Sequence, residues 1–83
     1  MHLLEPKEEY KIYVLRDCPY SIKALKMLDD HNKTYDVIYV GEEMKYQDFK
    51  SKFGQDATFP RIYKNGKFLG GSDSLKFWFI NKS

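Results

Sequence analysis

The fold of this chain is decided by residues 10–21, which read YKIYVLRDCPYS. The run over residues 12–15 is apolar without interruption, which is typical of a central strand buried on both faces. The strand pattern breaks around Cys18 and Pro19, and a helical pattern follows, with apolar residues at every third position from Ile22. This stretch therefore predicts a buried strand that leads through a short turn directly into a helix.

A second strand and a second helix are predicted downstream. Residues 34–40 contain another apolar run and predict a strand, and residues 44–53 place their aromatic side chains on one helical face. Gly54 follows as a natural C-terminal cap. The first strand-helix-strand segment should form a right-handed parallel unit.

A hairpin and a final helix complete the pattern. Residues 61–69 carry Asn65-Gly66 between two β-rich runs, and Asn-Gly supplies the two positive-φ residues of a type I′ turn. Ser72 is a suitable N-cap for the last helix, which has an apolar face of Leu75, Trp78 and Phe79. The order β-α-β-α-β-β-α predicts an α/β fold, with a four-stranded mixed sheet and helices on both faces.

Length and composition indicate one small soluble domain spanning residues 1–83, with residues 1–8 as a loose lead-in. Apolar residues make up 42% of the chain and charged residues 31%, a globular balance. No apolar run approaches the roughly 20 residues of a membrane span. The N-terminal sequence lacks the apolar core of a signal peptide, so we expect no secretion and no membrane.

Charge and cysteine content exclude further classes. The net charge of +2 is too small for non-specific nucleic-acid binding. A single cysteine cannot form an internal disulfide, so a reducing compartment, the cytoplasm, is expected. One cysteine and two distant histidines also make a protein-only zinc site improbable, and no metal ligand is predicted.

Cys18 is the candidate nucleophile. A lone cysteine is more often a small buried hydrophobic residue, but this one lies between a buried strand and a helix. At a helix N-terminus, the free N–H groups and the dipole favour the thiolate over the thiol. Pro19 suits the first helical turn, and Arg16 is a nearby cation.

Three segments together resemble the glutaredoxin family. They are Cys18-Pro19-Tyr20-Ser21 at the strand-to-helix turn, Thr58-Phe59-Pro60 before the hairpin and Gly70-Gly71-Ser72-Asp73 at the last helix. The resemblance covers about residues 10–80 and implies the thioredoxin fold of glutaredoxin type. It implies a catalytic motif of Cys18, Pro19, Tyr20 and Ser21.

The resemblance also implies a glutathione site, whose expected residues are Arg16, Tyr20, Phe59, Pro60, Gly71, Ser72 and Asp73. By this resemblance the Phe59-Pro60 bond is cis, and Ser72 and Asp73 hold the γ-glutamyl end of glutathione. Arg16 is the candidate for the glycine carboxylate. The family usually has its basic residue three positions before the cysteine, where this chain has Leu15.

Ser21 stands where dithiol glutaredoxins have a second cysteine. Either the protein is naturally monothiol, or a resolving cysteine has been replaced. The resemblance implies a glutathione-dependent thiol-disulfide oxidoreductase that acts in electron transport and redox homeostasis as a monomer. Its implied co-substrate is glutathione, and its implied partners are glutathionylated or disulfide-containing proteins, with ribonucleotide reductase as one candidate.

Two alternatives stay open. One is a carrier of a glutathione-ligated iron–sulfur cluster, although the common monothiol members have Cys-Gly-Phe-Ser and Pro19 departs from that pattern. The other is a non-catalytic thioredoxin-fold adaptor that holds a partner at the edge near Pro60.

Overall fold

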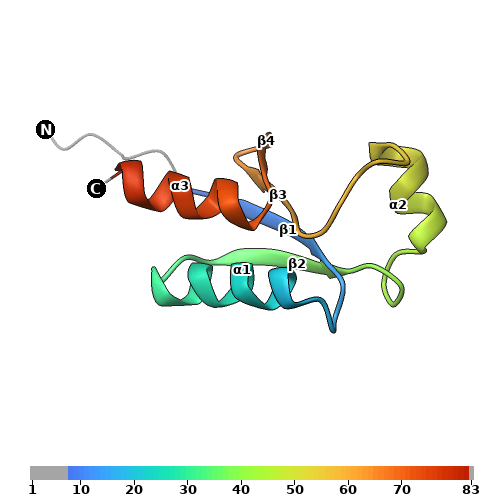
Figure 1. Cartoon of the computed structure of the whole chain (residues 1–83), viewed down its shortest axis with the longest axis horizontal. Coiled ribbons are helices and arrows are strands. Elements are labelled where there is room, and N and C mark those ends of the chain that lie inside the picture. Colours follow the sequence, from blue (N-terminus) through green and yellow to red (C-terminus); the bar gives the residue numbers. More distant parts are fainter. Residues whose placement is uncertain (1–7, 83) are drawn as a thin grey trace, which may run out of the picture.

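Four strands and three helices make up the computed structural model, which describes residues 8–82 (Figure 1). The strands are β1 (Tyr10–Val14), β2 (Tyr35–Tyr39), β3 (Arg61–Lys64) and β4 (Lys67–Gly70). The helices are α1 (Pro19–Asp30), α2 (Tyr46–Phe53) and α3 (Ser72–Lys82). Of the expected lead-in, residues 1–7 lie outside the described residues.

The sheet is mixed, and its strand order is β2-β1-β3-β4. β1 pairs with β2 in parallel and with β3 antiparallel, while β3 and β4 form an antiparallel hairpin. Asn65 and Gly66 at the hairpin turn have φ values of 51° and 80°, the positive pair that a type I′ turn requires. The predicted fold class and element order are therefore confirmed.

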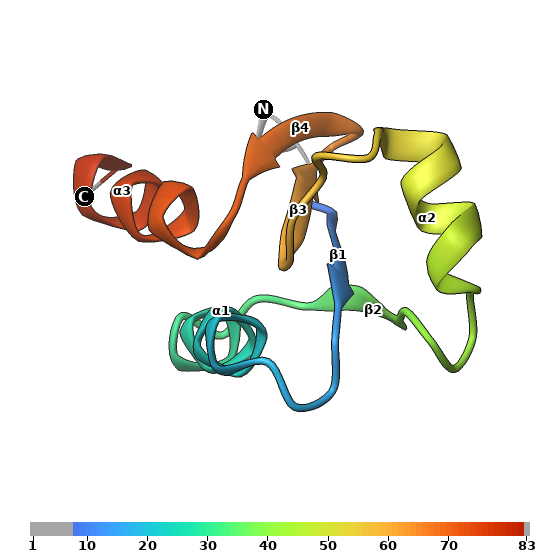
Figure 2. The same cartoon turned by 45° about the vertical axis from the view of Figure 1, so that its right-hand side comes forward.

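β1 lies inside the sheet, between β2 and β3, and both of its faces are covered by helices (Figure 2). Helices α1 and α3 lie on one side of the sheet and α2 lies on the other. Side chains alternate along a strand, so Ile12 and Val14 point to the first side and Tyr13 to the second. All three are buried, as the uninterrupted apolar run predicts.

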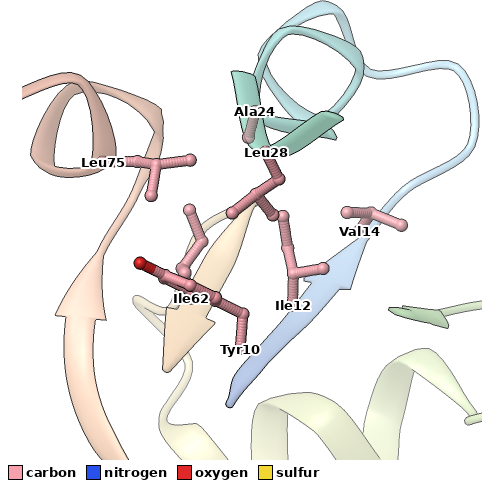
Figure 3. Packing of buried hydrophobic residues seen from close by; sticks show 7 residues of the cluster. All are labelled: Tyr10, Ile12, Val14, Ala24, Leu28, Ile62 and Leu75. Atoms are coloured by element: carbon pink, nitrogen blue, oxygen red, sulfur yellow. The ribbon is translucent and has the colours of Figure 1, made fainter. Parts of the chain in front are cut away.

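The core beneath α1 and α3 is mainly aliphatic (Figure 3). Its buried members come from the strands β1 and β3 and from the helices α1 and α3: Tyr10, Ile12, Val14, Ala24, Leu28, Ile62 and Leu75. Leu28 and Leu75 have no exposed surface, so each helix is anchored by a fully buried leucine. Full burial of such a side chain stabilises the fold by roughly 1.5–3 kcal/mol.

The core beneath α2 is aromatic. Phe49 of α2 is fully buried and lies 5.8 Å from Tyr13, measured between ring centroids. The ring of Phe53 contacts Tyr13 edge-on, with centroids 5.0 Å apart, and the ring of Tyr63 from β3 also contacts Tyr13 edge-on. Edge-on and tilted pairs suit the quadrupoles of aromatic rings, so this short helix is held by ring contacts.

The last helix departs from the sequence prediction in two ways. It begins at Ser72, so the residue before it, Gly71, occupies the N-cap position expected for Ser72. The Gly71 carbonyl accepts the first helical hydrogen bond from the Leu75 N–H at 3.0 Å. Trp78 is only partly buried, and its indole N–H donates to the Tyr10 hydroxyl at 3.1 Å.

Truncation of Phe49 should destabilise the protein strongly. Phe49→Ala leaves a cavity under α2, and we expect the free energy of unfolding to fall by about 3–5 kcal/mol. Phe77, which is 65% exposed, gives the matched control. Phe77→Ala should change the free energy by no more than about 0.5 kcal/mol. Urea unfolding followed by circular dichroism measures both, and equal losses would contradict the assignment of the core.

Candidate active site

Three segments of the chain come together at one end of the sheet. β1 and β3 are antiparallel with Tyr13 opposite Arg61, so Pro60, just before β3, borders the carboxyl end of β1. β4 finishes at the same end of the sheet, where Gly70 pairs with Ile62. The turn that carries Cys18 leaves β1 from this end. The three motifs singled out in the sequence therefore surround the carboxyl end of the central strand.

Cys18 occupies the N-cap position of α1. Its backbone is extended, with φ −82° and ψ 121°, and Pro19 begins the helix. The Cys18 N–H donates to the Leu15 carbonyl at 3.2 Å, and the Cys18 carbonyl accepts the Ile22 N–H at 3.0 Å. The thiol is only partly buried. Cys18 is thus fixed at the positive end of a helix dipole and is open to a reagent.

The pKa of the Cys18 thiol is lowered. Burial acts in the opposite direction and is the largest single influence, because it penalises the charged thiolate. Donor groups of the first helical turn outweigh it: the backbone N–H and the hydroxyl of Ser21 and the backbone N–H of Tyr20 act on the thiol and lower its pKa. These donors favour the thiolate, which is the nucleophilic form of cysteine.

Ser21 connects the thiol to the end of β1. Its side chain is buried, with 1% exposed, and its hydroxyl oxygen accepts the Leu15 N–H at 3.3 Å. The Leu15 carbonyl therefore accepts a hydrogen bond from the Cys18 N–H, and the Leu15 N–H donates one to the Ser21 hydroxyl. The turn is closed by these two hydrogen bonds, one to the backbone and one to the Ser21 side chain.

Pro60 and Gly71 meet at the site. The Phe59-Pro60 peptide bond is cis, as the family resemblance implies. Pro60 is buried, and a side-chain carbon placed on Gly71 would lie 3.5 Å from the Pro60 carbonyl oxygen. The backbones of these two segments are thus in close approach. Gly70 has a φ of +130°, which glycine adopts more easily than any other residue. A side chain at this position would also collide with Ser74.

The loop before β3 is held from the α2 side. The ring of Phe59 stacks on Phe49, with centroids 4.4 Å apart. The Lys50 ammonium donates to the Ala57 carbonyl at 2.5 Å. These contacts join the proline loop to the aromatic core beneath α2.

The first turn of α3 presents polar groups at the same end of the sheet. Ser72 is 7% exposed and buried at the helix start, while Asp73 in the next position is exposed. Free N–H groups at a helix N-terminus suit a carboxylate ligand. The expected roles of Gly71, Ser72 and Asp73 in binding glutathione stay predictions.

Arg16 pairs with an acidic side chain, Glu42, that lies 26 positions away in the sequence. Its Nε and Nη2 donate to the two carboxylate oxygens of Glu42 at 2.7 and 2.8 Å. Glu42 follows β2, which is the parallel neighbour of β1, so both residues leave adjacent strand ends. Adjacent parallel strands run in the same direction, so their carboxyl ends lie side by side. A basic residue just after one such strand and an acidic residue just after the other are therefore a sequence signal for this ion pair.

Tyr20 stands at the surface beside the thiol with 60% of its area exposed. Among residues 8–82, no group of three His, Cys, Asp or Glu side chains is placed to hold a metal ion. No helix in that range has the length and hydropathy to span a bilayer. The candidate site of the described residues thus combines a thiol of lowered pKa, a cis-proline and a helix start on an α/β scaffold.

Comparison with known proteins gives the family. The family model described as Glutaredoxin matches residues 11–69. Glutaredoxin 1 of Rickettsia prowazekii is 38% identical over 66 residues, covering 77% of this chain and 70% of the relative. Glutaredoxin 1 of Rickettsia conorii is 36% identical over 66 residues. The match covers 77% of this chain and 65% of the R. conorii protein. The chain belongs to the glutaredoxin family.

Solved structures agree on the fold. Glutaredoxin 1 from Francisella tularensis, complexed with cacodylate, superposes with a TM-score of 0.76 at 22% identity. The alignment covers 92% of this chain and 96% of that one. The buckwheat glutaredoxin–glutathione complex superposes with a TM-score of 0.80 at 19% identity, covering 90% and 71%. Oxidised glutaredoxin 2 from Chlamydomonas reinhardtii gives 0.72 at 28% identity, covering 90% and 74%.

Ser21→Ala should raise the pKa of Cys18. The variant removes the hydroxyl donor to the sulfur and keeps the backbone donor, so the thiolate loses part of its stabilisation. Alkylation of Cys18 by iodoacetamide, followed against pH, should therefore have a higher midpoint and a lower rate at neutral pH. Ser51, an exposed serine of α2, provides the control Ser51→Ala, whose profile should match that of the parent. Superimposable profiles for Ser21→Ala and the parent would show that the hydroxyl does not act on the thiol.

Proposed function

We propose that this chain is a glutathione-dependent thiol-disulfide oxidoreductase that works through Cys18 alone. The observation that carries the proposal is a partly exposed thiol of lowered pKa at the start of α1, at the end of the sheet that also carries the cis Phe59-Pro60 bond. Membership of the glutaredoxin family supports it. A related protein of the same fold, the buckwheat glutaredoxin, forms a complex with glutathione.

The first step is attack by the Cys18 thiolate on the glutathionyl sulfur of a protein–glutathione mixed disulfide. A new sulfur–sulfur bond joins Cys18 to glutathione, and the protein thiolate leaves and takes up a proton. Backbone N–H groups at the start of α1 stabilise the attacking thiolate. The carboxylate and amine of the γ-glutamyl group are proposed to bind at Ser72 and Asp73.

A second glutathione completes the cycle. Its thiolate attacks the glutathione sulfur bound to Cys18, which releases oxidised glutathione and regenerates the Cys18 thiolate. Neither step requires a thiol at position 21. Ser21 acts in this scheme as a hydrogen-bond donor to the sulfur. Reduction of a protein disulfide by a dithiol route does require a second thiol and should be weak in this chain.

The proposed setting is a reducing compartment such as the cytoplasm, where glutathione is the available reductant. Glutathionylated proteins are the proposed substrates, and ribonucleotide reductase is a candidate partner for a dithiol form. We propose that the chain acts as a monomer and forms one glutaredoxin domain over residues 1–83.

Turnover of a glutathionylated peptide tests this function. With glutathione present, the chain should release the peptide thiol and oxidised glutathione well above the uncatalysed rate, as followed by mass spectrometry. Cys18→Ser should reduce the rate to the uncatalysed level, because it removes the nucleophile. Turnover no faster than uncatalysed exchange in the parent chain would overturn the proposal and favour a carrier or adaptor.

Ser21→Cys tests whether the scaffold supports dithiol chemistry. The variant places a second thiol next to Cys18 and should gain reduction of a protein disulfide such as that of insulin. The same assay on the parent chain should show little activity. Absence of a gain, with deglutathionylation retained, would show that position 21 cannot resolve a mixed disulfide in this fold.

A further inference from the structure

The Arg16–Glu42 pair is a bidentate contact whose guanidinium belongs to the turn that carries the thiol. Two parallel hydrogen bonds of 2.7 and 2.8 Å join the guanidinium to both carboxylate oxygens. The guanidinium also lies over the ring of Tyr39, 4.1 Å from its centroid. A carboxylate on one edge and an aromatic ring on one face thus hold Arg16 in a defined orientation.

The pair is placed by the topology of the sheet. β1 and β2 run parallel with Val14 opposite Tyr39, and the Val40 N–H continues the ladder to the Val14 carbonyl at 2.9 Å. Arg16 follows β1 by two residues and Glu42 follows β2 by three. Arg16 is also two residues before Cys18, so it is the basic side chain that the active-site turn itself carries.

We propose that Glu42 is an internal competitor that occupies Arg16 and lowers the preference of the Cys18 site for anionic disulfides. This inference rests on the proposed function only in that Cys18 reacts with disulfides. A carboxylate is what Arg16 would bind in an incoming anionic ligand, and Glu42 already fills the fork of the guanidinium. The ligand class concerned is a disulfide that carries a carboxylate, of which a glutathione mixed disulfide is one example.

The competition is weak enough to be displaced. The side chains of Arg16 and Glu42 are 57% and 46% exposed, so water screens the pair. The pKa of Arg16 is raised and that of Glu42 is lowered, first through the shared hydrogen bonds and also through their opposite charges. Both groups are therefore ionised throughout the neutral pH range, so Glu42 competes for Arg16 across that range.

Two small disulfides of different charge measure the effect. Dithiobis(nitrobenzoate) carries a carboxylate on each ring, whereas dithiodipyridine is neutral at the same pH. The Cys18 thiolate displaces one aromatic thiolate from either reagent and forms a mixed disulfide, and the released thiolate or thione is followed by its absorbance. The ratio of the two second-order rate constants cancels changes in the nucleophilicity of Cys18.

Glu42→Gln should raise the ratio of anionic to neutral reactivity by about 2- to 5-fold, the range expected for an exposed ion pair. Glu43→Gln is the matched control. It removes the same charge from the adjacent residue, whose carboxylate accepts the Tyr39 N–H at 3.1 Å and does not contact Arg16. An unchanged ratio in Glu42→Gln, or an equal rise in Glu43→Gln, would overturn the proposal.

Arg16→Met separates competition from simple repulsion. In this background, Glu42→Gln should change the ratio less than in the parent, because no guanidinium is left to be released. An effect of the same size in both backgrounds would mean that Glu42 repels anions directly and would overturn the proposal. The rates need no glutathione turnover. A chain that fails the deglutathionylation assay can therefore still confirm or refute the role of Glu42.

Discussion

Burial of β1 on both faces is the constraint on which the active-site end of the molecule depends. Ile12 and Val14 are fully buried toward α1 and α3, and Tyr13 is buried among the aromatic rings beneath α2. A shift of β1 by one residue would exchange these two sets of side chains, so its register is fixed. The turn that begins at Leu15 and delivers Cys18 therefore starts from a defined point.

The two cores support different parts of the site. Leu28 and Leu75 anchor α1 and α3, whose N-termini carry the thiol and the candidate anion site. Phe49 holds the ring of Phe59 and so supports the loop that contains Pro60. Functional groups on fixed element ends are positioned more precisely than groups on free loops. The site is thus assembled from both faces of the sheet and depends on both cores.

Local signals in the sequence were sufficient for the order of elements, because an apolar run, an Asn-Gly pair and a Cys-Pro pair act within a few residues. Contacts between distant residues were not predictable in the same way. Arg61 lies over the rings of Phe53 and Phe68, and its Nε donates to the Tyr63 hydroxyl. Arg16 meets Glu42 across 26 positions of sequence. The parallel β1 and β2 bring their carboxyl ends together and so indicate that Arg16 and Glu42 can meet, but the pairing itself depends on competition among partners that the local sequence does not encode.

The residue at position 21 can form hydrogen bonds within the turn and can attack a mixed disulfide at Cys18, and serine and cysteine differ in both abilities. The Ser21 hydroxyl accepts the Leu15 N–H and also helps to lower the pKa of Cys18, so one buried group satisfies a backbone donor and favours the thiolate. A thiol is a weak acceptor and a weak donor, and would do both less well. It would, however, attack a mixed disulfide at Cys18, which a hydroxyl cannot do. In this chain the turn therefore gains hydrogen bonding at residue 21, and in the proposed cycle the resolving thiol comes from another molecule.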